Sequence, residues 1–103
     1  MYKIEVYVPV THVEAVKSAM FAAGAGKIGN YDCCCFETHG TGQFRPLTGS
    51  SPFIGNFEII EKVAEIKLEM VCAHEAIGSA IAAMKAKHPY ETPAYQYFLV
   101  MGQ

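Results

Sequence analysis

The chain has 103 residues, of which 51% are hydrophobic and 17% charged, a composition that is typical of one folded domain and excludes intrinsic disorder. The net charge is −2 and the eight Lys and Arg residues are scattered, so we expect no direct binding to nucleic acid. No apolar run reaches about 18 residues and the N-terminus lacks the order of a signal peptide, so we expect a cytoplasmic protein without a membrane segment.

The first quarter of the chain predicts a strand followed by a helix. Apolar residues alternate over Tyr2–Val8, which is typical of a half-buried strand. Thr11 and Glu14 have the spacing of a capping box, so a helix is expected over about His12–Ala23. Its apolar face comprises Val13, Val16, Ala19, Met20 and Ala23. Gly24 or Gly26 is expected to end the helix in the left-handed conformation.

The middle of the chain combines a short predicted strand with a long loop. The segment Tyr31–Thr38 is predicted as a second strand, with apolar groups on both faces. From His39 to about Glu61 the sequence is rich in Gly, Thr, Ser and Pro, but phenylalanines recur within it. A loop of this length in a compact domain is unusual and often functional. We expect an ordered loop that covers a sheet edge or a subunit contact, in preference to a catalytic lid.

The last third repeats the strand and helix periods. Alternation over Lys62–Cys72 predicts a strand with one apolar side, formed by Ala64, Ile66, Leu68, Met70 and Cys72. Helical spacing predicts a helix over about His74–Lys87 that Pro89 ends, with an apolar stripe of Ile77, Ala80, Ile81 and Met84. A last strand is expected over Ala94–Val100, and it is apolar on both sides. The complete order is βαββαβ, which predicts a single ferredoxin-like α+β domain over residues 1–103. Two helices would cover one face of a four-stranded antiparallel sheet, and the two-sided last strand predicts a homo-oligomer.

The segment His88-Pro89-Tyr90-Glu91, between the second helix and the last strand, has two interpretations. A carboxylate beside an imidazole fixes its tautomer, so His88 and Glu91 could act as an acid–base pair or as two metal ligands. Alternatively, His88 caps free carbonyls at the helix end, Glu91 holds the turn through backbone amides, and Tyr90 packs at a subunit contact. We favour the second interpretation, because no nucleophile with an adjoining base lies nearby in the sequence.

Three contiguous cysteines, Cys33, Cys34 and Cys35, form a second candidate site. Thiolates suit Cu(I) and Zn, and His39 could add a ligand. The spacing is not the Cys-x-x-Cys of a zinc knuckle, and a strand would place only Cys33 and Cys35 on one face. We favour reduced cysteines that serve as small hydrophobic residues on a buried strand.

The glycine-rich stretch "HGTGQFRPLTGSS" is a third candidate site. Its backbone amides, the Thr41 hydroxyl and the Arg45 guanidinium could hold an anion. It lacks the Gly-Lys-Ser/Thr ending of a phosphate-binding Walker loop. The alternative is a set of turns that need positive φ angles and are capped by hydroxyl groups.

Three stretches of the sequence resemble known families. The stretch "HPYETPAYQYF" resembles the corresponding segment of the CutA proteins. The stretch "GAGKIGNYDCCCFETHGTGQFRPLTGSSPFIG", together with the preceding "YVPVTHVEAVKSAMFAAGAGKIGNY", resembles the CutA/PII-like insert domain of the NGG-interacting-factor family of dimetal-binding proteins. The resemblance covers almost the whole chain and implies a CutA-like or PII-like fold, a trimer and a stand-alone version of the insert. The paired metals of full-length members are held by another part, so their ligands match no residue here.

These observations favour a non-enzymatic, oligomeric binding or regulatory module. Its ligand site is expected between subunits, at His39, Thr41, Arg45, His88, Tyr90 and Glu91. The alternative is a divalent-metal-binding protein that uses His88, Glu91, Cys33 or Cys35. A small metal-dependent hydrolase is the least favoured reading, and the sequence leaves the ligand and any protein partner unidentified.

Overall fold

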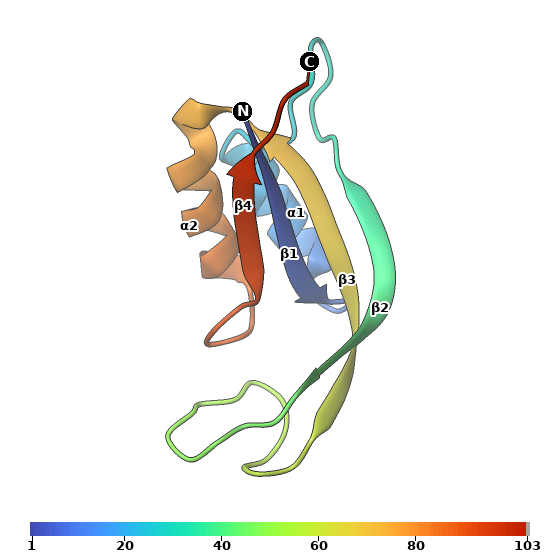
Figure 1. Cartoon of the computed structure of the whole chain (residues 1–103), viewed down its shortest axis with the longest axis vertical. Helices are drawn as coiled ribbons and strands as arrows, with labels where there is room; N and C mark the ends of the chain where they lie inside the picture. Colours follow the sequence, from blue (N-terminus) through green and yellow to red (C-terminus); the bar gives the residue numbers. More distant parts are fainter. Residues whose placement is uncertain (103) are drawn as a thin grey trace.

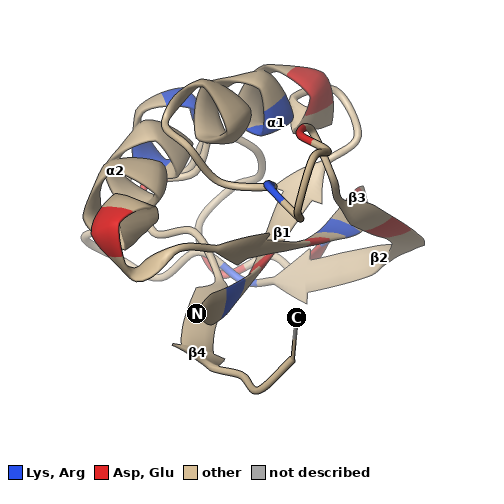
Figure 2. Cartoon of the chain, turned by 90° about the horizontal axis from the view of Figure 1, so that it is seen from above, with Lys and Arg blue, Asp and Glu red and all other residues tan. Residues whose placement is uncertain are grey.

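The computed structural model describes residues 1–102 and has the predicted order of elements. These are β1 (Tyr2–Pro9), α1 (Val13–Ala22), β2 (Phe36–Phe44), β3 (Glu61–Cys72), the 3₁₀ turn η1 (His74–Ala76), α2 (Ile77–Lys87) and β4 (Tyr95–Leu99). The strands form one antiparallel sheet in the order β2-β3-β1-β4. Both helices cover the same face of this sheet (Figures 1 and 2). The ferredoxin-like prediction is therefore confirmed.

The hydrophobic core lies between the helices and the two central strands. Alternation places Ile4, Val6 and Val8 of β1 on the helix side, where each is fully buried. The core consists of Ile4, Val6, Val8, Val13, Val16, Met20, Ala25, Ile66, Leu68, Met70, Cys72, Ala80 and Met84. Ala64, which the alternation assigned to the same side, is exposed. The reason is that β3 runs beyond the helices at this end, as Figure 1 shows.

The start of α1 differs from the predicted capping box. His12, not Thr11, occupies the N-cap position, and no side chain caps the helix. The Thr11 hydroxyl instead lies 2.8 Å from the His12 Nδ1 atom, and Glu14 pairs with Lys17 at 2.8 Å. Because the helix begins one residue later than the box requires, Thr11 and Glu14 cannot reach each other's backbone amides in the required way.

The predicted second strand begins too early. Residues 31–35 lie outside the sheet, and β2 starts at Phe36. Local bonds satisfy the backbone before it: Ile28 and Tyr31 exchange two N–H···O bonds of 2.9 Å, and the Cys34 N–H donates to the Gly26 carbonyl at 2.8 Å. Cys33 has a φ of 55°, which an extended strand does not allow. The interpretation of the cysteines as buried strand residues is therefore wrong.

The loop after β2 is shorter than predicted, because β2 continues to Phe44 through the Gly-Thr-Gly sequence. Gly40 pairs with Glu65 and Gly42 pairs with Val63, so this part forms a two-stranded ribbon with β3. The connecting loop then covers residues 45–60. It is ordered by its own bonds, among them Glu58 N–H to the Pro46 carbonyl at 2.7 Å. Figure 1 shows the loop below the helix layer, at the end of the sheet opposite the termini.

The face of the sheet that the helices leave open carries charged pairs. Lys3 lies 2.8 Å from Glu69, and Lys67 lies 3.7 Å from Glu5. The hydrogen bond to Glu69 raises the pKa of Lys3, and the same bond lowers the pKa of Glu69. Within residues 1–102 no helix has the length and apolar character needed to cross a membrane.

Candidate functional site

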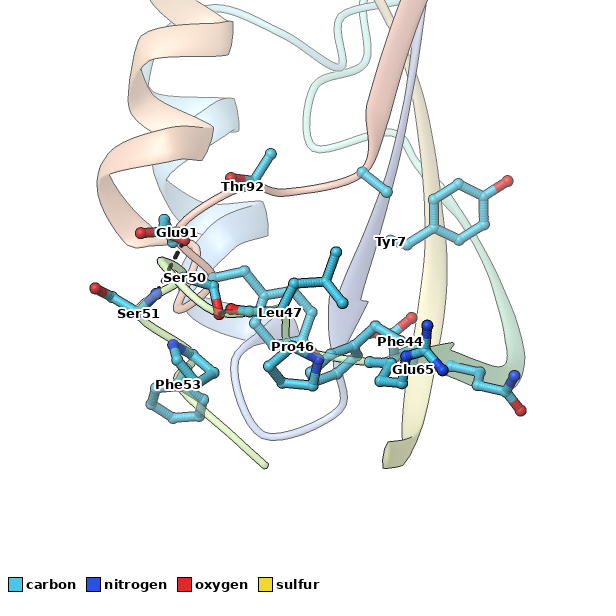
Figure 3. Close-up of a pocket in the computed structure, with 15 residues that line it drawn as sticks. Tyr7, Phe44, Pro46, Leu47, Ser50, Ser51, Phe53, Glu65, Glu91 and Thr92 are labelled. Atoms are coloured by element: carbon cyan, nitrogen blue, oxygen red, sulfur yellow. Dashed lines mark hydrogen bonds between the residues drawn. The ribbon is translucent and has the colours of Figure 1, made fainter. Parts of the chain in front are cut away.

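A cavity of about 390 Å³ lies where the 45–60 loop meets the sheet and the turn after α2 (Figure 3). Its walls are largely apolar, with Phe44, Pro46, Leu47 and Phe53 from the loop side. Tyr7 lines it from the open face of β1. Three of the predicted ligand-binding residues line it as well: Arg45, Tyr90 and Glu91.

The polar centre of the cavity is a hydrogen bond between Tyr90 and Glu65. The Tyr90 hydroxyl donates to the Glu65 Oε2 atom at 2.9 Å, and Glu65 is only 9% exposed. Burial raises the pKa of the Tyr90 phenol well above its ordinary value, and the neighbouring Glu65 carboxylate adds to this effect. The carboxylate lies directly over Gly42, where any side chain would collide with it. Phe44 packs edge-on against the Tyr90 ring, with 5.6 Å between centroids.

His88 lies behind Tyr90 and is 7% exposed. Its Nε2 atom is 2.8 Å from the Tyr7 carbonyl, and its Nδ1 atom is 3.1 Å from the Tyr90 N–H. Nδ1 must accept because its partner is a donor, so the proton is on Nε2 and donates to Tyr7. Burial lowers the pKa of His88, which favours this neutral form.

Both ring nitrogens of His88 are therefore used inside the fold. A neutral imidazole in this arrangement has no lone pair for a metal ion and none for general base catalysis. The expectation that the His88 side chain caps the helix is also wrong in detail. Its ring donates a hydrogen bond to the Tyr7 carbonyl of β1 and to no carbonyl of α2. The His88 backbone N–H closes α2 by donating to the Met84 carbonyl at 2.9 Å.

Glu91 does not meet His88 but turns to the loop. Its Oε1 atom accepts a hydrogen bond from the Ser51 N–H at 3.2 Å, drawn as a dashed line in Figure 3. The prediction that Glu91 holds its own turn through backbone amides is thus wrong, because the amide that it accepts from belongs to the loop. The acid–base pair of His88 and Glu91 is not formed.

Replacing Glu91 with alanine is expected to loosen the loop without unfolding the domain. The bond is exposed, so its loss should change the free energy of unfolding by less than about 1 kcal/mol. Amide hydrogen exchange at Ser51 and its neighbours should become faster, because this contact fastens the loop to the turn. Glu75→Ala, on the exposed η1 turn, is the matched control. Unchanged exchange at Ser51 would contradict the role given to Glu91.

The remaining predicted residues lie elsewhere. His39 and Thr41 are exposed on β2 and do not line the cavity. Cys33 and Cys35 are exposed, while the Cys34 thiol bonds the Asp32 carbonyl at 3.5 Å. Desolvation raises the pKa of the Cys35 thiol, which disfavours the thiolate that binds metals. Among residues 1–102, no group of three or more His, Cys, Asp or Glu side chains converges on a common point.

Comparisons with known proteins give long matches. No protein-family model matches the chain. Proteins named GTP cyclohydrolase 1 type 2 homolog are 47% identical over 96 residues in Mycobacterium leprae and 44% identical over 98 residues in Bacillus subtilis. These matches cover 93% and 95% of the chain but only 25% and 26% of the relatives. The chain thus spans about a quarter of the length of the curated relatives it matches.

Solved structures agree with these matches. A Bacillus cereus protein related to NIF3 superposes with a TM-score of 0.80 at 40% identity, over 94% of this chain and 24% of that one. The CutA protein of Archaeoglobus fulgidus gives a TM-score of 0.69 at 16% identity, over 100% and 87% of the two chains. GlnK of Bacillus subtilis gives 0.55 at 15% identity, over 94% and 82%. The resemblance to the NGG-interacting-factor family is confirmed: almost the entire chain is the counterpart of one segment of these NIF3-related proteins, and that segment has the CutA/PII-like fold.

Proposed function

We propose that this chain is a non-enzymatic, oligomeric module of regulatory type and that the cavity beside the 45–60 loop is its ligand site. The observation that carries the proposal is the cavity of about 390 Å³, with apolar walls around one buried polar pair, Glu65 and Tyr90. Small-molecule sites typically have this size and this combination of apolar lining with a few polar groups.

A binding role fits the chemistry of the cavity better than a catalytic one. His88, which lies behind the lining residue Tyr90, has both ring nitrogens in hydrogen bonds. The Ser50 hydroxyl donates to the Leu47 carbonyl at 2.7 Å, so it has no general base. The name GTP cyclohydrolase 1 type 2 homolog describes relatives about four times as long as the match, and we do not transfer an activity from it.

Assembly into a homo-oligomer is supported by the exposed edge of the sheet. β4 is an edge strand, and its Tyr97, Phe98 and Leu99 are 46%, 42% and 71% exposed. An apolar edge of this kind invites pairing with another chain. We favour a trimer, which the CutA/PII-like resemblance implies.

Native mass spectrometry of the purified chain tests the assembly. We expect a trimer, and we expect Leu99→Glu to shift the mass to the monomer because a charge would be buried at the contact. Val10→Glu, at an exposed site outside β4, is the control and should remain assembled. A monomer for the unaltered chain at all concentrations would contradict the proposal.

Divalent-metal binding is the weaker candidate. It is favoured by the name of the Archaeoglobus fulgidus neighbour, a periplasmic divalent cation tolerance protein. Both ring nitrogens of His88 are occupied by hydrogen bonds, which counts against metal binding. The same mass spectra decide between the two candidates, because a metal adduct that survives buffer exchange and disappears in His88→Ala would reverse this ranking.

The ligand site itself is tested by mapping amide chemical shifts in the presence of pooled small aromatic amidines, amides and carboxylates. Shifts concentrated at residues 43–53 and 88–94 would support the site. Shifts confined to other regions, or none at millimolar concentration, would contradict it.

A further inference from the structure

We infer that the cavity selects a planar organic cation, an amidinium or guanidinium group, which seats against the Glu65 carboxylate. This inference rests on the proposed ligand site and names the class of ligand. It differs from the sequence-based expectation of an anion held by Arg45. Three features of the cavity support it: its charge, its free acceptor positions and its aromatic lining.

The charge balance of the cavity favours a cation. Its lining includes two carboxylates, Glu65 and Glu91, and one cationic side chain, Arg45. Arg45 is exposed, whereas Glu65 is buried. The ion pairs found in residues 1–102 join Lys3, Lys17 and Lys67 to other carboxylates, and none includes Glu65. A buried carboxylate without a cation is costly, so a ligand cation would recover part of that cost.

Glu65 retains acceptor capacity toward a ligand. A carboxylate offers about four lone-pair positions. One hydrogen bond to Glu65 is formed by the Tyr90 hydroxyl at Oε2. The Tyr90 contact and the close packing over Gly42 hold the group in place. An amidinium or guanidinium presents two parallel N–H donors, which match a carboxylate better than a single ammonium does.

The aromatic lining suits the same class of ligand. Tyr7, Phe44, Phe53 and Tyr90 all contribute to the cavity. The ring face of an aromatic side chain carries negative potential and attracts cations within about 6 Å. A planar cation can therefore stack on a ring while its edge bonds the carboxylate. An anionic group at the same place would face both the rings and the two carboxylates.

The experiment compares three probes of nearly equal shape: benzamidinium, benzamide and benzoate. Amide chemical-shift titrations of the assembled protein give a dissociation constant for each and show where it binds. We expect benzamidinium to bind at residues 43–53 and 88–94 about tenfold more tightly than either of the others, as one charge-assisted pair provides. Glu65→Gln should remove this preference and leave the affinity for benzamide within about threefold.

Two further variants keep the test decisive if Glu65→Gln folds poorly. Gly42→Ala keeps the carboxylate but displaces it, because a Cβ atom would occupy its position. It should also weaken benzamidinium binding about tenfold. Glu75→Gln, at an exposed carboxylate outside the cavity, is the matched control and should change the affinity by less than about threefold.

The outcomes separate this inference from the proposed function. Tighter binding of benzoate at the same residues would overturn the cation preference and leave the ligand site standing. A benzamidinium preference that survives in both Glu65→Gln and Gly42→Ala would overturn the role of Glu65. If none of the three probes shifts these residues at millimolar concentration, both the inference and the ligand site fail.

Discussion

Replacing His88 with alanine is expected to lower the free energy of unfolding by about 2–4 kcal/mol. The substitution removes a buried ring and leaves the Tyr7 carbonyl and the Tyr90 N–H without their partners. An unsatisfied buried group costs about 1–3 kcal/mol, and the space left by the ring adds to this cost. Urea denaturation followed by circular dichroism measures the change. His39→Ala is the control, because His39 is exposed and should cost less than about 0.5 kcal/mol.

The stabilisation from His88 should also depend on pH. Burial lowers its pKa below the ordinary value of 6.5, so on acidification the unfolded chain takes up the proton before the folded chain does. The contribution of His88 is therefore complete above about pH 6.5 and decreases as the pH falls through the lower folded-state pKa. The difference in stability between the unaltered chain and His88→Ala should shrink over this interval. A difference that stays constant between pH 5 and pH 8 would contradict a neutral, buried His88.

The turn that contains His88 connects three parts of the molecule. His88 donates to the Tyr7 carbonyl of β1, Tyr90 donates to Glu65 of β3, and Glu91 accepts from Ser51 of the loop. Each contact joins segments that are 25 to 81 residues apart in sequence. The floor and the rim of the cavity are thus positioned by one short turn. A stretch without a catalytic arrangement is therefore central to the proposed ligand site.

The sequence predicted the fold because the local patterns of the central elements agree with their burial. The period of two in β1 identified Ile4, Val6 and Val8 as core residues, and all are fully buried. The period near 3.6 in the second helix identified Ala80 and Met84, which are buried as well. In these elements the apolar side chains determine which face is buried, and their spacing along the sequence reveals that face.

The cavity was less predictable, because it depends on strand register. Glu65 belongs to the polar side of its strand, like Lys67 and Glu69, and nothing in the local pattern distinguishes it. It is buried because Tyr90 and the loop reach it and because Gly42 leaves room beside it. The Gly-Thr-Gly stretch was read as loop, although its missing side chains permit this close packing. A signal existed in those glycines, but the pairing of β2 with β3 was needed to interpret it.

The cysteine segment shows a second kind of failure. Residues with strand propensity were predicted as a strand, but the chain must first cross from the end of α1 to the sheet edge. Gly24 and Gly26, with φ angles of 107° and 77°, make this crossing and confirm the expected left-handed stop. The path that residues 26–35 must follow between α1 and the sheet edge therefore overrides the strand propensity of their side chains.

Replacing Gly26 with alanine is expected to be among the most damaging single changes in the chain, at about 3–5 kcal/mol. An added Cβ would lie 2.7 Å from two atoms of the Phe21 ring and 2.9 Å from the Cys34 carbonyl oxygen. The Phe21 ring can rotate, but the Cys34 carbonyl is backbone. The Cys34 N–H also donates to the Gly26 carbonyl, and the Gly26 N–H donates to Val71, so relief by movement would break these bonds.

Gly29→Ala separates the steric effect from the conformational one. Gly29 also has a positive φ, of 57°, but an added Cβ would meet nothing within 4 Å. It should therefore cost only the left-handed penalty of about 1–2 kcal/mol. Urea denaturation of both variants measures the difference, and equal losses would show that the contacts with Phe21 and Cys34 do not constrain the chain. A larger loss for Gly26 would mean that the path of the cysteine segment is fixed by this one close approach, because backbone atoms bound on both sides of Gly26 cannot yield to a methyl group.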